Sequence, residues 1–322
     1  MTSIKDVAKH AGVAISTVSK VLNNYPNISE ATRKKVNEAV EELNFVPNSV
    51  AAALSSKNAG RVALMIDLNV TTQAIDEIAM RYISGALTKA MELNLDVITL
   101  FVFMFQDRTT EELIRYLQSQ SISGIIIYGA SEDDLVLQEL VASGKFKCVT
   151  VDQAHVGEHT SSVTIDHRKA QYDVAKTLMK EASAKKVLYI GGYEKSYVTR
   201  NRLKGMEEAA LEKGVELIVK NADFLEDKAT EIAMQYGKDV DAIACASDLM
   251  AIGARNAMMQ MGTDKPICGF DGISLMRYAG NGIYTIDQNF SQISAIAMEE
   301  LQRLMAGEPG RFVEVEYSVV KN

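Results

Sequence analysis

Apolar residues between Ile4 and Asn44 recur at helical spacing in three short groups. The groups are Ile4, Val7, Ala8 and Ala11; Ile15, Val18, Val21 and Leu22; and Ala31, Val36, Val40 and Leu43. This spacing places each group on one face of a helix, so three helices are expected to pack together through these faces. Gly12 suits a tight turn after the first helix, and Ser29 suits the N-cap of the third. The pattern predicts a small bundle with a helix-turn-helix arrangement.

After Gly60 the pattern changes to short apolar runs that alternate with amphipathic helices. The expected strands are Arg61–Leu68, Leu95–Val102, Gly124–Gly129, Lys147–Asp152, Ser162–Asp166, Lys186–Gly191, Val215–Val219, Ala242–Ser247 and Ile267–Asp271, and Phe312–Val320 also has strand character. Such alternation is typical of α/β proteins with helices on both faces of parallel sheets. So many strands exceed a usual single sheet, and the polar stretch Gln153–Ser161 lies near their middle. We therefore predict two lobes with a cleft between them, joined through this stretch.

The chain thus divides into three predicted parts. Residues 1–46 form a helical headpiece, residues 47–60 a hinge, and residues 61–322 a two-lobed body. Pro47 ends the third helix, and the alanine-rich segment 48–57 has helical propensity but is too short to hold a helix alone. We expect the hinge to fold only when another surface supports it.

Composition and charge narrow the class of protein. The net charge is −8, yet residues 1–60 contain seven Lys and Arg against five Asp and Glu, so a mildly basic module precedes an acidic body. The longest nearly apolar run, Val97–Phe105, is too short to cross a bilayer, and no secretory signal opens the sequence. We expect a cytoplasmic protein with no membrane contact. Cys148, Cys245 and Cys268 lack metal spacing and are expected to be small core residues.

The second predicted helix has two different faces. Its polar positions are Ser16, Thr17, Ser19, Lys20 and Asn23. Short hydrogen-bonding side chains on one helix face suit the base edges of a DNA major groove. The alternative is an ordinary helical bundle whose polar face meets only water.

Ordered motifs give this headpiece a specific resemblance. They are Ile4-Lys5-Asp6-Val7-Ala8, Ala11-Gly12-Val13, Ser16-Thr17-Val18-Ser19, Val21-Leu22-Asn23, Thr32-Arg33 and Pro47-Asn48 with Leu54. Together they resemble the headpiece of the lactose-repressor (LacI/GalR) family of bacterial regulators. Weaker motifs extend the resemblance through the body: Arg202-Leu203-Lys204-Gly205, Ala246-Ser247-Asp248-Leu249-Met250-Ala251-Ile252-Gly253-Ala254 and Gly269-Phe270-Asp271. The implied body has the fold of periplasmic sugar-binding proteins.

The resemblance implies how DNA would be bound. The helix from Ile15 to Asn24 would lie in the major groove, with Ile15, Ser16 and Lys20 at base edges. Backbone contacts would come from Thr17, Ser19, Asn23 and Arg33, with Asn48 completing the DNA-binding set. In the hinge, Leu54 stands where the family inserts a leucine into the central minor-groove step, and such wedging bends the duplex. A homodimer reading a palindromic operator is implied.

The resemblance also implies an effector site in the cleft, where open α/β sheets bind ligands at the carboxyl ends of strands. The implied residues are Tyr128, Asp152, Arg202, Phe224, Ser247 and Asp271. Arginine and aspartate suit hydroxyl groups, and a ring face suits a sugar. As alternatives, Phe224 is an ordinary core residue, and the strand-end aspartates are helix caps.

Other classes of function find little support in the sequence. It has no G-x-S-x-G elbow, P-loop or G-x-G-x-x-G motif, so we expect no catalytic residues and no cofactor. Asp152, His155 and His159 form an alternative metal site, but their polar surroundings favour solvent-facing histidines and no metal. A transport binding protein would share the body without needing the headpiece. The sequence therefore predicts a transcriptional regulator, most simply a repressor, controlled by a sugar-like effector.

Overall fold

The computed structural model describes residues 2–22, 25, 27–43, 45, 61–67 and 77–322, in two compact units, Met1–Ala59 and Gly60–Asn322. The first unit has the three predicted helices, α1 (Ile4–Ala11), α2 (Ile15–Leu22) and α3 (Glu30–Glu42). They pack around a core that includes the fully buried Val7, Val18 and Val36. The predicted hinge 47–60 lies outside the described residues.

Local signals in the sequence explain where these helices begin and end. Ser3 and Asp6 form a capping box at the start of α1, because each side chain accepts a hydrogen bond from the other's backbone N–H. Gly12 ends α1 in the left-handed conformation, with φ of 65°. Ser29 caps α3 by accepting a hydrogen bond from the Thr32 N–H, which confirms its predicted role.

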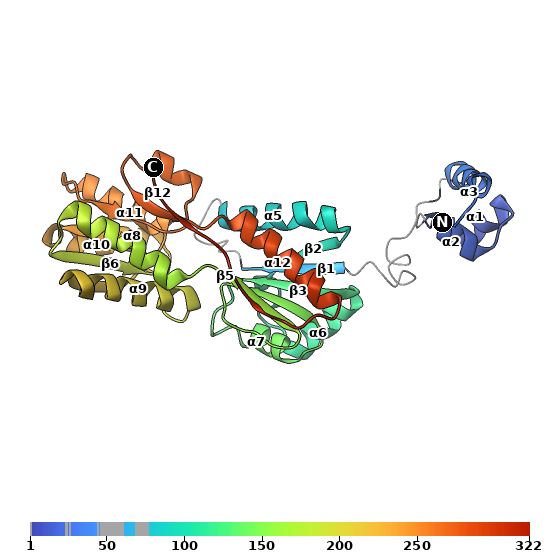
Figure 1. Ribbon diagram of the computed structural model, residues 1–322, viewed down its shortest axis with the longest axis horizontal. Helices are drawn as coiled ribbons and strands as arrows, with labels where there is room; N and C mark the ends of the chain where they lie inside the picture. The colour runs from blue at the N-terminus through green and yellow to red at the C-terminus, as the bar shows by residue number, and fades with distance from the viewer. Residues whose placement is uncertain (1, 23–24, 26, 44, 46–60, 68–76) are drawn as a thin grey trace. The chain divides into compact units, whose positions relative to one another are not determined.

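The second unit contains two parallel sheets with helices on both faces (Figure 1). The first sheet has the order β11-β5-β4-β3-β1-β2. Its strands are β1 (Arg61–Ile66), β2 (Asp96–Phe101), β3 (Ile122–Tyr128), β4 (Lys147–Val151), β5 (Thr160–Thr164) and β11 (Phe312–Glu314). Its helices are α5 (Glu77–Leu93), α6 (Thr110–Ser119), α7 (Leu135–Ala142) and α12 (Phe290–Met305). We call this the N-terminal lobe.

The second sheet, with the order β12-β10-β9-β8-β6-β7, forms the C-terminal lobe. Its strands are β6 (Lys186–Gly191), β7 (Glu216–Asn221), β8 (Ala242–Cys245), β9 (Ile267–Cys268), β10 (Tyr284–Asp287) and the antiparallel β12 (Ser318–Lys321). Its helices are α8 (His167–Ala182), α9 (Tyr197–Lys213), α10 (Glu226–Tyr236) and α11 (Asp248–Gln260). The three cysteines are buried and free, as predicted.

The chain crosses between the lobes three times, and the first crossing lies elsewhere than predicted. The stretch Gln153–Ser161 connects β4 to β5 inside one sheet, so its prediction as the inter-lobe connection is wrong. The crossings follow β5, β10 and β11. The predicted strand Phe312–Val320 is two strands, β11 and β12, one in each lobe, and β10 was not predicted.

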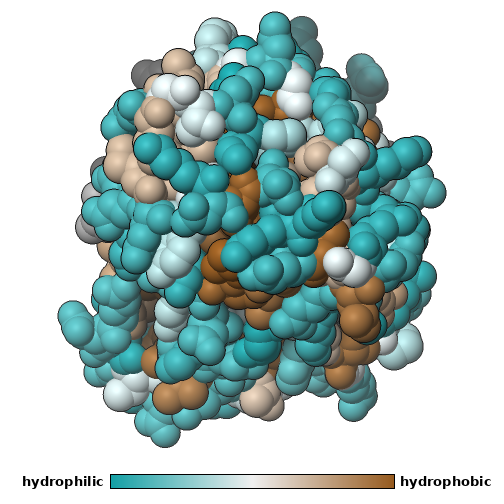
Figure 2. Space-filling view, turned by 90° about the vertical axis from the view of Figure 1, so that its left-hand side faces the viewer, coloured by the Kyte–Doolittle hydropathy of each residue, from teal (hydrophilic) through white to brown (hydrophobic). Residues whose placement is uncertain are grey.

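The end of the C-terminal lobe is mainly hydrophilic, with separate apolar patches (Figure 2). Such scattered apolar residues are usual on a solvent-facing surface. Among the described residues, no helix is long and apolar enough to span a membrane.

A close approach of α5 and α12 fixes the N-terminal lobe. A Cβ atom at Gly85 would lie 2.1 Å from the backbone carbonyl oxygen of Ser291, which is far inside contact distance. The two helices therefore touch through backbone atoms at a point where only glycine fits.

We expect Gly85→Ala to lower the free energy of unfolding by about 1–3 kcal/mol, because the overlap outweighs the higher helix propensity of alanine. Ser84→Ala, on the exposed side of the same helix, is the matched control and should change stability by less than about 0.5 kcal/mol. Urea unfolding of both variants measures the difference. Equal stability of the two would contradict the backbone contact.

Candidate functional site

A cleft of about 690 Å³ opens between the lobes and receives side chains from both. It is lined by all six residues predicted for the effector, namely Tyr128, Asp152, Arg202, Phe224, Ser247 and Asp271. Tyr128 ends β3 and Asp152 follows β4, so these two lie at the carboxyl ends of strands in the N-terminal lobe. Phe224, Ser247 and Asp271 follow β7, β8 and β9 at the equivalent edge of the C-terminal lobe.

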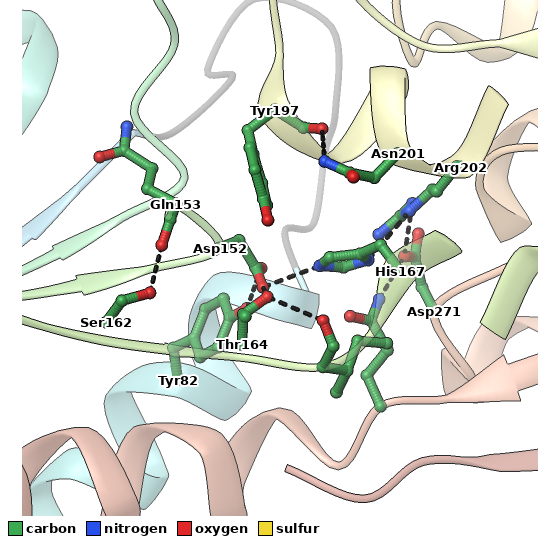
Figure 3. A network of polar contacts seen from close by, with 12 residues as sticks. Tyr82, Asp152, Gln153, Ser162, Thr164, His167, Tyr197, Asn201, Arg202 and Asp271 are labelled. Carbon is green, nitrogen blue, oxygen red and sulfur yellow. Dashed lines mark hydrogen bonds and ion pairs between the residues drawn. The ribbon is translucent and has the colours of Figure 1, made fainter. Parts of the chain in front are cut away.

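A continuous chain of buried polar side chains crosses the floor of this cleft (Figure 3). The imidazole of His167 lies between Asp152 and Arg202, with its Nε2 2.9 Å from Asp152 Oδ1 and its Nδ1 3.4 Å from Arg202 Nε. Arg202 Nη1 then donates to Asp271 Oδ1 at 3.3 Å, and Gln288 Nε2 donates to the same oxygen at 2.8 Å. We call these five residues the floor network.

Two further hydroxyl groups hold Asp152. Thr164 donates to its Oδ1 at 2.9 Å, and Tyr82 donates to its Oδ2 at 3.2 Å. The face of the Arg202 guanidinium packs on the ring of Phe270 at 3.8 Å. Each charged group of the network is therefore satisfied, which burial of charge requires.

Burial sets the protonation of the network. It lowers the pKa of His167 despite the neighbouring Asp152, so the ring is neutral, donates through Nε2 and accepts from Arg202 through Nδ1. Burial acts to raise the pKa of Asp152, but His167, Thr164 and Arg202 outweigh it and hold that pKa below its ordinary value. Burial raises the pKa of Asp271 to about 7, against the pull of Arg202.

Three of the cleft residues have backbone conformations that side chains rarely adopt. Asp152 has φ of 60°, Phe224 of 64° and Asp271 of 117°. The ring of Phe224 occupies the space where a Cβ at Gly192 would stand, so the glycine directly after β6 makes room for this ring. Backbone strain of this kind costs on the order of 1–3 kcal/mol per residue and concentrates at functional sites.

Aromatic rings line the cleft on the side of the N-terminal lobe. Tyr82 packs against Tyr128 with ring centroids 4.6 Å apart and against Phe290 at 5.1 Å. Tyr128 shares a hydrogen bond with Ser294 through its hydroxyl, so it presents mainly its ring. Ser247 accepts the Met250 N–H as the N-cap of α11 while also lining the cleft.

Ion pairs join the lobes at the rim of the cleft. Lys195 Nζ lies 2.8 Å from Asp133 Oδ1, and Arg200 pairs with Glu132. On the other side, Arg81 Nη1 donates to the carbonyl oxygen of Gly272 at 3.1 Å. The two lobes are therefore in contact around the cleft.

The headpiece presents part of the predicted DNA-binding set. On α2, Ile15, Ser16 and Lys20 are exposed, Thr17 and Ser19 are half-buried, and Val18 faces the core. Arg33 Nη2 donates to the carbonyl oxygen of Tyr25 and so also braces the segment between α2 and α3. Asn23, Asn48 and Leu54 lie outside the described residues.

Comparisons with known proteins find relatives for both units of the chain. Residues 3–48 match the model of bacterial regulatory proteins of the lacI family, and residues 106–309 match a periplasmic binding protein domain. The transcriptional regulator RegA of Clostridium saccharobutylicum is 29% identical over 94% of this chain and 92% of its own. The chain belongs to the LacI family of bacterial regulators.

Two further proteins extend the comparison of this LacI-family regulator. The ribose operon repressor of Halalkalibacterium halodurans is 28% identical over 96% of this chain and 92% of its own. The crystal structure of the lac repressor dimer bound to operator and the anti-inducer ONPF superposes with a TM-score of 0.83 at 22% identity, covering 99% of this chain and 98% of that chain. The predicted fold is thereby confirmed, and the named relatives are regulators of transcription rather than enzymes.

Sequence reasoning missed three residues of the site in this regulator. Tyr82, His167 and Gln288 contribute to the floor or its support, yet none lies in a motif that was considered. His167 begins α8 directly after the first crossing, and Gln288 lies in the second. Neither had a local sequence signal, because the positions of the crossings were not visible in the sequence.

The alternative metal site is not assembled among the described residues. Asp152 contacts His167 instead of His155 or His159, and His159 Nδ1 lies 2.8 Å from Lys147 Nζ. No cluster of three or more His, Cys, Asp or Glu side chains with metal-binding geometry occurs in the described part of the chain.

The buried, neutral His167 predicts a dependence of stability on pH. The unfolded chain protonates this histidine near pH 6.5, whereas the folded chain does so only at lower pH. Stability is therefore fully present above about pH 6.5 and falls below it, by up to about 1.4 kcal/mol per pH unit.

We expect His167→Gln, which keeps an N–H near Asp152 without a titrating ring, to lose less stability than the original chain between about pH 7.5 and 5.5. Chemical unfolding at several pH values gives the difference between the two curves. The comparison cancels titration of other groups common to both proteins. Parallel curves would mean that the pKa of His167 is the same in the folded and unfolded chains, which would contradict its lowering by burial.

Proposed function

We propose that this regulator binds a palindromic operator as a homodimer and that a sugar or sugar derivative in the cleft controls its affinity for DNA. The observation that carries the proposal is the pairing of an exposed polar helix face in the first unit with a cleft lined by the six effector residues in the second. Such a protein would act as a repressor in the cytoplasm, where bacterial DNA is accessible.

The DNA contacts follow from the exposed positions of α2. Ser16 and Lys20 lie one helical turn apart, so they reach neighbouring base edges from a helix in the major groove, with Ile15 beside them. Thr17, Ser19, Asn23 and Arg33 would grip the backbone. We further propose that residues 1–46 form the DNA-binding domain, that 47–60, with Asn48 and Leu54, forms the hinge, and that 61–322 binds effector.

The cleft suits a ligand that carries several hydrogen-bond donors. Asp152 and Asp271 accept hydrogen bonds, Arg202 supports them, and Tyr128 and Phe224 offer ring faces. The named relative that regulates a ribose operon makes a sugar the natural first class to test. Binding would shift DNA affinity only if the ligand prefers one arrangement of the lobes over another.

The homodimer has a candidate surface on α5. Met80, Leu87 and Met91 are 60%, 42% and 80% exposed and lie on one side of the helix, because their spacing follows its turn. Several exposed large apolar side chains on one side of a helix are typical of an interface. A two-fold pair of headpieces would then match a palindrome.

Selection from a random DNA pool tests the DNA-binding proposal. We expect the purified protein to enrich a palindrome with a flexible central step, and Lys20→Ala to bind it at least about tenfold more weakly. Lys9→Ala, which removes the same charge from the exposed face of α1, should change affinity by less than about threefold. Equal losses in both variants would assign Lys20 to general electrostatics, and no enrichment with or without sugars would reject operator binding.

Sedimentation velocity tests the dimer. Leu87→Glu places a charge among these exposed apolar side chains of α5, so we expect it to convert the dimer to a monomer at micromolar concentration and to weaken operator binding. Leu211→Glu is the control, because Leu211 is 84% exposed on α9, in the other lobe. A Leu87→Glu protein that stays dimeric would place the interface elsewhere.

A further inference from the structure

The side chain of Gln288 has an unused hydrogen-bond acceptor in the floor of the cleft. Only 1% of the residue is exposed, and its Nε2 donates to Asp271 Oδ1 at 2.8 Å. In its ionised form, which Arg202 favours, the carboxylate of Asp271 accepts but does not donate, so this contact fixes the orientation of the amide. Among the described residues, Oε1 of Gln288 then has no hydrogen-bond partner, which is costly for a buried oxygen. The floor therefore requires a donor at this point.

Negative charge dominates the described lining of the cleft. Its carboxylates belong to Asp67, Glu77, Asp134, Asp152, Asp223 and Asp271, whereas Arg202 is its only lysine or arginine. The guanidinium of Arg202 already contacts Asp271 and the carbonyl oxygen of Ala246. Asp134 and Asp152 take part in no ion pair with a lysine or arginine: Asp134 accepts the Ser131 N–H, and Asp152 is held by hydroxyls and the neutral imidazole. Glu77 pairs with Arg81, Asp223 with Lys228 and Asp271 with Arg202. Among the described residues, Asp152 and Asp134 thus remain without a lysine or arginine partner, so the floor has one hydrogen-bonded carboxylate, that of Asp152, whose charge no cation balances.

Aromatic rings stand beside these carboxylates. Tyr82 donates its hydroxyl to Asp152, and its ring packs with those of Tyr128 and Phe290 in the same wall. Ring faces next to carboxylates are a common environment for ammonium groups, because the face of a ring attracts a cation.

We infer that the effector carries a protonated amino group, bound at the floor by Gln288 Oε1 and the carboxylates of Asp152 and Asp271. The inference rests on the proposed effector site and specifies its ligand as an amino sugar or a related amino polyol. An ammonium group supplies N–H donors for Gln288 Oε1 and for a carboxylate, and its charge would balance that of Asp152. A single hydroxyl would satisfy Gln288 but leave Asp152 without a cationic partner. A phosphate or carboxylate would be repelled.

The surroundings of Asp271 predict that the affinity for an amine depends on pH. Burial raises its pKa to about 7, and its neighbours include the charged Arg202 and Asp152, the neutral His167 and the buried Asp248, whose own pKa burial raises well above its ordinary value. An ammonium favours the ionised form of Asp271, so amine affinity should fall as the pH drops from about 8 to about 6. The amines of 2-amino sugars themselves titrate in this range, so the pH series uses 1-amino-1-deoxysorbitol, whose ammonium group stays protonated and leaves the protein as the cause of the change.

The test is calorimetric titration and thermal shift of the full chain with matched ligands. The probes are glucosamine, galactosamine, mannosamine and 1-amino-1-deoxysorbitol, each beside its neutral hydroxyl counterpart, with N-acetylglucosamine and glucose 6-phosphate. We expect at least one amine to bind about tenfold or more tightly than its neutral counterpart, and glucose 6-phosphate not to bind. The amine inference is wrong if a neutral or phosphorylated probe binds as tightly as the amines, or if no amine stabilises the protein.

Variants locate the amino group. Asp152→Asn should weaken the amine about tenfold or more, and by a larger factor than it weakens any neutral probe that binds. Because that change touches the floor network, Asp134→Asn provides a second variant on the half-exposed wall, where we expect a loss of about threefold. Asp107→Asn, an exposed aspartate outside the cleft lining, is the charge-matched control and should have no effect. Equal losses in all three variants would contradict a site in the cleft.

The outcome separates this inference from the proposed function. Release or tightening of the selected operator by a neutral sugar would retain the regulator and overturn the amine. Amine binding in a protein that enriches no DNA would retain the site and overturn the regulator.

Discussion

The arrangement of the two lobes depends on one buried polar chain, the floor network. Burying a charge such as that of Arg202 is expensive, and an arginine in this position is tolerated only when its partners are held in place. Asp271 follows β9, Gln288 lies in the second crossing and His167 opens α8 after the first, so the network joins segments that are far apart in the sequence. The first and second crossings are therefore tied to the network by the hydrogen bonds of His167 and Gln288.

The chemistry of the cleft follows from the same constraint. The lobes meet through carboxylate and amide side chains at the carboxyl ends of their strands. The polar groups that remain facing the cleft are therefore mostly hydrogen-bond acceptors. Positive φ values at Asp152 and Asp271 turn these side chains inward at a conformational cost that packing alone would not justify. A site built in this way selects its ligand by the donors and the charge that it brings.

Sequence reasoning located much of this because strand ends are visible in a hydrophobic pattern. The family resemblance implied Asp152 and Asp271 as cleft residues, and the apolar runs that precede them agreed with a place at strand ends. The stretch Gln153–Ser161 was wrongly predicted to connect the lobes because its polar residues were interpreted as solvent-exposed. Ser161 is fully buried, and its hydroxyl donates to Glu300 Oε2 and accepts the backbone N–H of Arg311. Polar residues that serve buried hydrogen bonds have no local signature, because their partners come from elsewhere in the chain.

The buried contacts at the floor of the cleft and the exposed ion pairs at its rim differ in strength. This difference determines how the two-lobed body can respond to a ligand. The rim pairs of Lys195 with Asp133 and Arg200 with Glu132 are each about half exposed, and pairs of that kind contribute roughly 0–1 kcal/mol. The contacts around the mouth can therefore favour the closed lobes by only a small margin. Reversing a two-state equilibrium from 1:99 to 99:1 takes about 5.5 kcal/mol of differential binding. A ligand that contacts both Asp152 and Asp271 at the floor gains such a difference only while both lobes face it, because these two residues belong to different lobes. The hydrogen-bond donors and the charge of a ligand therefore affect the arrangement of the lobes through the floor of the cleft and not through its rim.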